Sequence, residues 1–527
     1  MKIYNTMTRE KENLKLLEPH KVKMYVCGPT TYNFIHLGNA RPLVVFDTIR
    51  RYFLFRGYEV NYVQNFTDVD DKIINKAIAE NDDPIKLASR YIEEFFIDAD
   101  ALGVLRADVH PRVSEHIPEI VEAVGSLIAK GYAYEVDGDV YFRVKSFADY
   151  GKLSGRSLDD MLAGARIEVD DRKENPADFV LWKKAKAGEP FWDSPWGAGR
   201  PGWHIECSVM STKYLGDTID IHGGGNDLVF PHHENEVAQA EALTGKPFVN
   251  YWMHNGFITV NNEKMSKSLG NFFVLRDILA KYPADVVRFY LIATHYRSPL
   301  DFDDTKLEEA KKALARLKTT SLLAEEVVGE GDFKLGFDDL DKDLLDEIEK
   351  YRQGFIVAMD DDFNTALAIA SLFDIAHRLN TYIAEMDRSS QVERATVKEA
   401  LSIFKELGQV LGIFMFEDRA QAKADELLEI FLSLRESLRK QKDFARADAI
   451  RDFLNEADIV IEDTPQGSRV KYEGEPEIDG LIGWLVDLRA DFKMAKDFNN
   501  ADSLRDDLQA RGVILEDTKE GVRWKFA

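Results

Sequence analysis

The sequence predicts an α/β protein: a doubly wound parallel sheet of the Rossmann type with an insertion, then an α-helical bundle and a duplicated small α+β unit. Three observations predict this order. A strand, loop, helix and strand pattern lies near the start, long amphipathic stretches begin near residue 305, and a 54-residue repeat lies near the end. A length of 527 residues is enough for three or four domains of about 100 to 200 residues each.

The first of these patterns is the opening unit of the sheet. Residues 22–26 alternate in hydrophobicity like a short strand, residues 38–57 carry apolar side chains at helical spacing, and residues 59–65 again read as a strand. In doubly wound sheets, ligands bind at the carboxyl ends of the strands. We expect residues 1–304 to form this domain, with an insertion at about 111–200, where the pattern becomes irregular.

The remaining residues predict a helical bundle and two copies of a small unit. The amphipathic stretches place the bundle at 305–420. Lys442-Asp443-Phe444 returns as Lys496-Asp497-Phe498, and Glu462-Asp463-Thr464 returns as Glu516-Asp517-Thr518. This duplication predicts a first repeat at 421–477 and a second repeat at 478–527.

Composition limits the possible partners and the cellular location. The 68 Lys and Arg against 93 Asp and Glu give a net charge of −25, so a nucleic acid would have to bind at local basic patches. No stretch of about 18 apolar residues appears and the first residues lack a signal-peptide core, so we expect a cytoplasmic protein without membrane contact. The only two cysteines, Cys27 and Cys207, exclude a disulfide framework.

Two polar segments suggest phosphate chemistry. His36-Leu37-Gly38-Asn39 stands at the start of the predicted helix 38–57, where unpaired N–H groups favour an anion. Lys264-Met265-Ser266-Lys267-Ser268 is a short loop with two cations, after the strand-like residues 257–260. By itself the first segment could be a surface histidine near a helix cap, and the second a solvated basic turn.

The two segments together resemble the signatures of the class I aminoacyl-tRNA synthetases. Lys264 to Ser268 matches one signature letter for letter, and His36 to Asn39 resembles the other, His-Ile-Gly-His. Leu37 replaces Ile, which changes little. Asn39 replaces the second His, so a charged role at position 39 is in doubt.

A third set of segments is similar to cysteinyl-tRNA synthetases in particular. These segments are Cys27 to Thr30, Asn65 to Asp71, Arg200 to Ser208, Phe230 to Glu236 and Asp361 to Thr365. The resemblance continues into the C-terminal units and so covers nearly the whole chain. It implies that the chain is a monomer and joins L-cysteine to tRNA(Cys) through cysteinyl-adenylate, using ATP with Mg2+ and one zinc ion per chain.

In that family, the zinc is held at the positions of Cys27, Cys207, His232 and Glu236. Two thiolates, an imidazole and a carboxylate can form a tetrahedral zinc site, and His232 and Glu236 share a helix face at i, i+4. His233 and Glu236 at i, i+3 would serve geometrically as well, and only the family pattern decides for His232. Four protein ligands are also typical of a closed structural site, which remains an alternative.

The resemblance also implies the other roles at the active site. His36, Gly38 and Asn39 are expected to hold ATP, and Lys264 and Lys267 to stabilise the developing pyrophosphate charge. Gly28, Thr67 and Trp203 are expected to bind cysteine, with ordinary core packing as the alternative for Trp203. Because zinc prefers sulfur to oxygen, we expect no editing domain against serine.

The family carries the C-terminal unit once, whereas this chain carries it twice. The second copy keeps an aromatic ring in Arg523-Trp524-Lys525, where the first copy has Arg469-Val470-Lys471. Stacking on a base contributes about 1 to 3 kcal/mol. We therefore expect Trp524, Arg523 and Asp517 of the second copy to contact the anticodon, although the first copy's place directly after the bundle favours the opposite assignment.

Three rival functions follow from the same residues. The cysteine ligase of mycothiol synthesis resembles this chain in its zinc and adenylation parts, but has no need of an anticodon-reading end. A zinc hydrolase would have no use for the Lys264 to Ser268 loop. A non-catalytic RNA-binding protein is disfavoured by the net charge of −25 and by the full set of active-site residues.

Overall fold

The structure, a computed structural model, divides into two compact units, residues 1–413 and 414–527. It describes residues 1–157, 171–260, 263–264, 273–329, 333, 335–464, 467–472, 476–518 and 521–526. Among the helices of these residues, none is long and apolar enough to cross a membrane.

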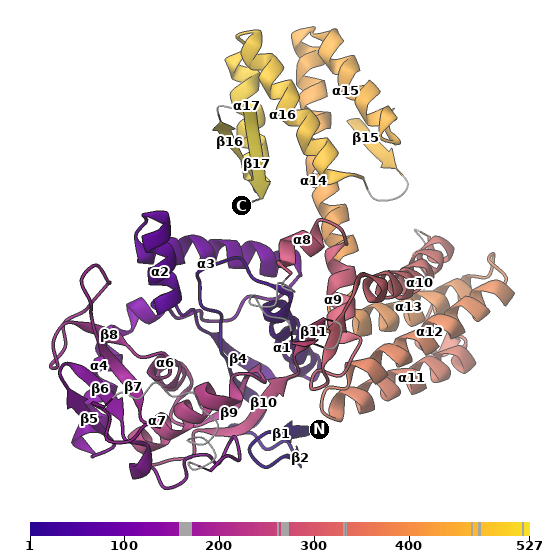
Figure 1. Cartoon of the computed structure of the whole chain (residues 1–527). Helices are drawn as coiled ribbons and strands as arrows, with labels where there is room; N and C mark the ends of the chain where they lie inside the picture. The colour runs from indigo at the N-terminus through magenta and orange to yellow at the C-terminus, as the bar shows by residue number, and fades with distance from the viewer. Residues whose placement is uncertain are drawn as a thin grey trace. The chain divides into compact units, whose positions relative to one another are not determined.

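The first unit is built on a four-stranded parallel sheet (Figure 1). Its order is β10-β9-β3-β4, with β3 at Lys21–Val26, β4 at Glu59–Gln64, β9 at Ile219–Gly225 and β10 at Val249–Asn255. The helix α1, Leu37–Phe55, connects β3 to β4, and both strands run in the same direction. The predicted strand, helix and strand at 22–65 are therefore confirmed, and the fold is the predicted doubly wound sheet.

In the sequence, a second sheet is inserted between strands β4 and β9 of the first sheet. Its strands are antiparallel in the order β5-β6-β7-β8. They contribute to a hydrophobic cluster that includes Val124, Phe142 and Trp182. The elements of this region are α2 (Asp71–Glu80), α3 (Pro84–Ala101), η1 (Val113–Glu115), α4 (Ile117–Ala129), β5 (Ala133–Val136), β6 (Asp139–Phe142), η2 (Val144–Ser146), β7 (Phe179–Lys184), β8 (Gly199–Pro201) and α6 (Ile205–Leu215).

Shorter elements complete the parallel-sheet part of the first unit. In a small sheet of order β12-β11-β13, β11 follows β10 in sequence, β12 leads into the loop Lys264 to Ser268, and β13 comes after that loop. These elements are β1 (Lys2–Asn5), β2 (Glu10–Asn13), η3 (Val229–His233), α7 (Glu234–Thr244), β11 (Ile258–Val260), β12 (Glu263–Lys264), α8 (Leu275–Leu279), α9 (Ala284–Ile292) and β13 (Leu300–Phe302).

The helical bundle belongs to the first unit and does not form a separate one. Its elements are α10 (Asp304–Val328), η5 (Phe337–Asp339), α11 (Lys342–Asp360), α12 (Thr365–Glu385) and α13 (Gln391–Leu411), which lie beside one another in Figure 1. We expected a domain of its own at 305–420. The buried Arg288 of α9 joins the two parts: its guanidinium pairs with Asp47 of α1 and donates to the Leu411 carbonyl of α13 at 3.0 Å.

The second unit contains the repeat, and both copies share one hydrophobic core. Each copy is two helices followed by a β-hairpin: α14 (Met415–Gln441), α15 (Phe444–Glu456), β14 (Ile459–Thr464) and β15 (Gly467–Tyr472), then α16 (Ile478–Met494), α17 (Phe498–Ala510), β16 (Val513–Thr518) and β17 (Gly521–Phe526). Phe431 and Ile450 of the first copy are buried with Leu485 and Leu504 of the second. The copies therefore pack together as one body.

Candidate active site

A cavity of about 370 Å³ opens at the carboxyl ends of β3 and β4, where a doubly wound sheet is expected to bind its ligands. It brings together most of the residues that the sequence singled out. Among its lining residues are Cys27, Gly28, His36, Gly38, Asn39, Thr67, Trp203, Cys207 and His232. Three of the four predicted metal ligands, Cys27, Cys207 and His232, therefore face the same space as the predicted phosphate-binding helix start.

The four predicted metal ligands form a tight cluster at one side of the cavity. The Sγ atoms of Cys27 and Cys207 are 3.7 Å apart, and Nε2 of His232 is 3.0 Å from Oε1 of Glu236. All four ligand atoms lie within 4.8 Å of one another. Two sulfurs at about 2.3 Å from one tetrahedral zinc would be about 3.8 Å apart. The cluster therefore fits a metal ion in both its donor atoms and its spacing.

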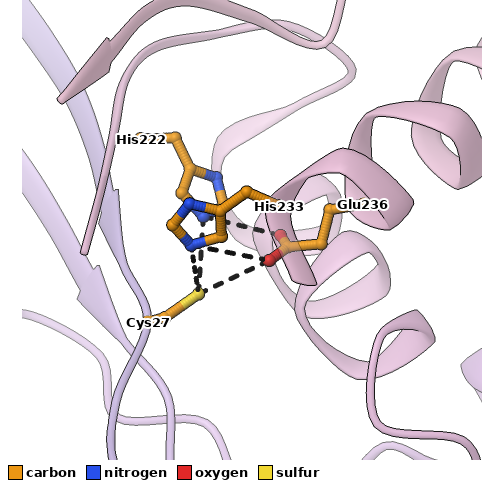
Figure 2. Close-up of side chains that lie close together, drawn as sticks. All are labelled: Cys27, His222, His233 and Glu236. Carbon is orange, nitrogen blue, oxygen red and sulfur yellow. Dashed lines mark hydrogen bonds and ion pairs between the residues drawn. The ribbon is translucent and has the colours of Figure 1, made fainter. Parts of the chain in front are cut away.

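A second set of four residues shares Cys27 and Glu236 with the first (Figure 2). Nε2 of His233 lies 3.3 Å from Sγ of Cys27, and Nε2 of His222 lies 3.5 Å from the same sulfur. His222 and His233 are absent from the lining of the 370 Å³ cavity, whereas Cys207 and His232 belong to it. Of the residues in which the two sets differ, only Cys207 and His232 of the predicted set therefore face this cavity.

His222 is the residue near the cluster that sequence reasoning missed. It stands on β9, and its ring stacks on Trp252 of β10 with centroids 4.4 Å apart. His222 and Glu236 are too far apart in the sequence to be related by the i, i+3 or i, i+4 spacing of a helix. Only the pairing of β9 with β3 brings it beside Cys27.

Burial sets the protonation of the cluster. It raises the pKa of Glu236 well above its ordinary value, and it does the same to the Cys27 thiol. The hydrogen bond from Cys27 lowers the pKa of Cys207 to about 7. Oε2 of Glu236 is buried without a hydrogen-bond partner among the described residues. A bound cation would compensate the buried carboxylate and thiolate charges, because it interacts favourably with both.

Hydrogen bonds orient the histidines around the cluster. Nδ1 of His233 lies 2.7 Å from Nε2 of His254, whose Nδ1 contacts the Thr6 hydroxyl at 2.8 Å. Nδ1 of His232 lies 2.9 Å from Nδ1 of His204, which leaves Nε2 of His232 directed at Glu236. Such partners fix the ring orientation of a metal-binding histidine.

The start of α1 forms another wall of the same cavity. His36 is the N-cap residue, and its N–H donates to the side-chain oxygen of Asn39 at 3.3 Å. Asn39 therefore stabilises the helix start, which a neutral amide can do without a second histidine. The first-turn amides of Leu37 and Asn39 already donate to the carbonyls of Phe273 and His36, at 3.2 and 2.8 Å, so the helix dipole and nearby side chains would hold an anion here.

The chain that follows the signature loop is fixed beside His36. The N–H of Leu37 donates to the Phe273 carbonyl at 3.2 Å, and the N–H of Leu275 donates to the Ile35 carbonyl at 3.0 Å. Before the loop, the backbone of Lys264 pairs with Thr259 in β12 and β11. Lys267 and the side chain of Lys264 lie outside the described residues.

The three residues expected to bind cysteine line the cavity. Gly28 has no room for a side chain, because a Cβ there would lie 1.6 Å from the Asn65 carbonyl oxygen. Thr67 donates its hydroxyl to Glu206 at 3.1 Å. Trp203 is 40% exposed and stacks on His232 with centroids 4.5 Å apart. Trp203 is thus a surface of the cavity and not a core residue.

The C-terminal candidates lie in the second unit. Arg523 is exposed, but Trp524 is half-buried against the shared core, as is Val470 at the equivalent position of the first copy. The Asp517 side chain lies outside the described residues, although its backbone pairs with Val522. Among the described side chains of the second unit, the exposed large aromatic rings are Phe444 and Phe498, at 57% and 60%. Neither ring was predicted as a site residue, although both belong to the Lys-Asp-Phe segments that repeat 54 residues apart.

Comparisons with known proteins agree with this geometry. Residues 13–312 match the model described as the tRNA synthetases class I (C) catalytic domain, and residues 354–415 match a DALR domain. A cysteine–tRNA ligase of Pelotomaculum thermopropionicum is 59% identical, with 90% of this chain and 100% of that protein covered. A second, of Desulforamulus reducens, is 58% identical with the same coverage. The chain belongs to the cysteine–tRNA ligase family.

Solved structures of other synthetases share the fold of this cysteine–tRNA ligase family member. Mycobacterium tuberculosis methionyl-tRNA synthetase in complex with methionyl-adenylate matches with a TM-score of 0.55 at 15% identity, covering 74% of this chain and 90% of that one. The ternary LeuRS–tRNA–LeuAMS complex of Agrobacterium radiobacter K84 also gives 0.55, at 13% identity, with 76% and 86% covered.

The relatives also bear on the repeat. Both ligases are covered completely while a tenth of this chain is left over, and a tenth of 527 residues is close to the 54-residue period. The uncovered share is therefore similar in size to one C-terminal unit.

Proposed function

We propose that this chain attaches L-cysteine to tRNA(Cys) in two steps, with one zinc ion and Mg2+-bound ATP, as a monomer in the cytoplasm. The observation that carries the proposal is the shared cavity. Cys27, Cys207 and His232 of the cluster line the same space as the start of α1, and the ligand atom of Glu236 lies within 4.8 Å of theirs. A thiol held at the cluster would place the amino-acid carboxylate on the side of the ATP phosphates.

In the first step, an oxygen of the cysteine carboxylate attacks the α-phosphorus of ATP. The bond to the β-phosphate oxygen breaks and pyrophosphate leaves. A carboxylate is already a nucleophile at neutral pH, so the protein has to position the reactants and neutralise charge. His36, Gly38 and Asn39 would hold the phosphates at the start of α1, and Lys264 and Lys267 would stabilise the charge that grows on pyrophosphate.

Selection of cysteine over serine is the demanding part of this function. A cavity that senses only shape separates such near-isosteres by about a hundredfold. Zinc supplies a thiophilic contact that binds the thiol of cysteine and disfavours the harder hydroxyl of serine. Gly28, Thr67 and Trp203 would enclose the rest of the amino acid, and His204 would hold the His232 ring in place.

In the second step, a hydroxyl oxygen of the terminal tRNA ribose attacks the carbonyl carbon of the adenylate. The new ester forms, AMP leaves, and the hydroxyl proton is released. The bundle and the second unit would bind the tRNA, with Arg523, Trp524 and Asp517 as the candidates for the anticodon. Full-length coverage of named cysteine–tRNA ligases favours this acceptor over the amino sugar of mycothiol synthesis.

The test is exchange of pyrophosphate into ATP, first with cysteine and then with serine, followed by charging of total tRNA. Cysteine-dependent exchange and cysteinyl-tRNA formation are expected, with serine giving background. If the protein exchanges pyrophosphate but does not charge tRNA, and transfers cysteine to an amino sugar, then the amino sugar and not tRNA is the acceptor of the cysteinyl group. Absence of cysteine-dependent exchange would contradict the function itself.

A further inference from the structure

A second cavity, of about 230 Å³, adjoins the first, and none of the roles proposed so far uses it. It lies between the antiparallel sheet of the insertion and the start of α2 and α6, all within the first unit. Its lining is Val69, Asp70, Asp71, Phe179, Val180, Lys183, Arg200, Pro201, Gly202, Trp203, His204 and Glu206. The position of this cavity relative to the metal cluster is therefore part of the fold of one unit.

One layer of side chains separates the two cavities. Trp203 lines both of them. Thr67 of the first cavity donates to Glu206 of the second at 3.1 Å. In the same way, His232 of the first lies 2.9 Å, ring nitrogen to ring nitrogen, from His204 of the second. A group in the second cavity would therefore lie one residue away from a cysteine held at the cluster.

The chemistry of the second cavity suits a nucleobase next to a phosphate. Phe179, Trp203 and His204 supply flat rings, and the Phe179 and His204 rings meet edge to face at 5.6 Å. Aromatic rings and polar edges are what proteins offer to a base that is not stacked in a duplex. Cavities for drug-sized ligands begin at about 300 Å³, so 230 Å³ suits a single ring system.

Three charged residues of the second cavity, Asp71, Lys183 and Arg200, lie together. Nζ of Lys183 is 3.0 Å from Oδ2 of Asp71, and Arg200 pairs with the same carboxylate. The Lys183 side chain keeps 32% of its surface exposed. A partly exposed lysine beside a base-sized cavity is suited to a phosphate of the entering strand.

We infer that the second cavity holds the base of the 3′-terminal nucleotide of the tRNA. The inference rests on the proposed function. Acyl transfer requires the terminal ribose at the cysteine carbonyl while the adenylate still occupies the first cavity. The base attached to that ribose then needs a neighbouring recess, and the 230 Å³ cavity shares Trp203 with the first.

The experiment separates the two chemical steps. Val180→Trp would fill the second cavity, and Lys184→Trp on the same strand is the matched control, because Lys184 is exposed and lines neither cavity. Cysteine-dependent pyrophosphate exchange should be unchanged in both variants. Single-turnover transfer from preformed cysteinyl-adenylate to tRNA(Cys) should slow by about ten- to a hundredfold in Val180→Trp alone, the effect of losing one base contact.

A modified tRNA tests whether the base itself is bound. A tRNA(Cys) with an abasic 3′-terminal nucleotide should slow transfer by the wild-type protein by a similar factor. The same tRNA should slow Val180→Trp no further, because the contact is already lost. Additive losses, or normal transfer by Val180→Trp, would overturn the inference.

Val180→Trp could misfold, and loss of pyrophosphate exchange would reveal this. A second variant then tests the inference. Lys183→Ala should slow transfer several-fold with exchange intact and should weaken the dependence of transfer on salt. Unchanged transfer and salt dependence in Lys183→Ala would count against the inference. Absence of cysteine-dependent exchange in the wild-type protein would instead contradict the proposed function.

Discussion

The candidate metal ligands of the first unit and the candidate tRNA contacts of the second unit differ in burial. Cys207 and Glu236 are 2% and 0% exposed, and each is held by neighbours from other elements. In the second unit, Arg523 is exposed and the free aromatic surface comes from Phe444 and Phe498. Substitutions in the first region should therefore change cysteine activation, and substitutions in the second should change only tRNA charging.

The largest effect is expected at the metal cluster. The wild-type protein should carry one zinc per chain, and His232→Asn should lose it. Cysteine-dependent pyrophosphate exchange should then fall by more than about a hundredfold, since even outer-shell partners of a metal contribute ten- to a hundredfold. Elemental analysis and exchange rates measure both changes.

His233→Asn is the matched control for this prediction, because His233 is the neighbouring histidine of the second set in Figure 2. It should keep its zinc, with affinity lowered at most by the amount expected for an outer-shell partner. Loss of zinc in His233→Asn with retention in His232→Asn would assign the ion to the other set.

The signature loop should give the next largest effect. Lys267→Ala should slow adenylate formation by about a hundredfold, equivalent to about 3 kcal/mol, because the lysine acts on charge that grows in the transition state. Cysteine binding should change little, which rapid-quench kinetics at several cysteine concentrations can separate. Lys281→Ala, an exposed lysine beyond the loop, is the control. A normal activation rate in Lys267→Ala would contradict the role of the loop.

In the second unit, Trp524→Ala should raise the tRNA concentration needed for charging by about five- to a hundredfold, the range of one stacking contact. Pyrophosphate exchange should stay intact. Trp524 also packs against the shared core, so Trp524→Phe should restore packing and part of the charging. Val470→Ala, at the equivalent position of the first copy, is the matched control.

Point substitutions test the repeat better than deletion of residues 478–527 does. The ring of Trp484 in the second copy stacks on Phe453 of the first with centroids 4.8 Å apart. Deletion would expose that core and confuse loss of folding with loss of tRNA contact. Equal effects of Trp524→Ala and Val470→Ala on charging would show that position 524 contributes packing and no contact to tRNA.

The smallest effects are expected at the two exposed phenylalanines. Phe444→Ala and Phe498→Ala should each change the free energy of unfolding by about 0.5 kcal/mol or less, because both rings are mostly exposed. Phe498→Ala should raise the tRNA requirement several-fold and Phe444→Ala should not, if the second copy reads the anticodon. The reverse result would assign recognition to the first copy.

The sequence predicted those parts of the site whose residues are close along the chain. His232 and Glu236 share a helix turn, and His36 and Asn39 share a helix start, so periodicity and capping rules apply to them directly. Helical spacing left the choice between His232 and His233 open, because both spacings reach Glu236, and the prediction of His232 came from the family resemblance. The cavity makes the difference, since only His232 lines it.

By itself, then, the sequence determined the opening strand, helix and strand and the repeat, and it predicted that the two thiols share one metal site. Only the tertiary structure decided that His222 of β9 lies beside Cys27 of β3, that Arg288 joins the bundle to the sheet, and that the two repeats share one core. The physical reason is the separation along the chain of the residues that interact. Local patterns follow from backbone periodicity within a few residues, whereas strand order and shared burial depend on contacts between segments that are far apart in the chain.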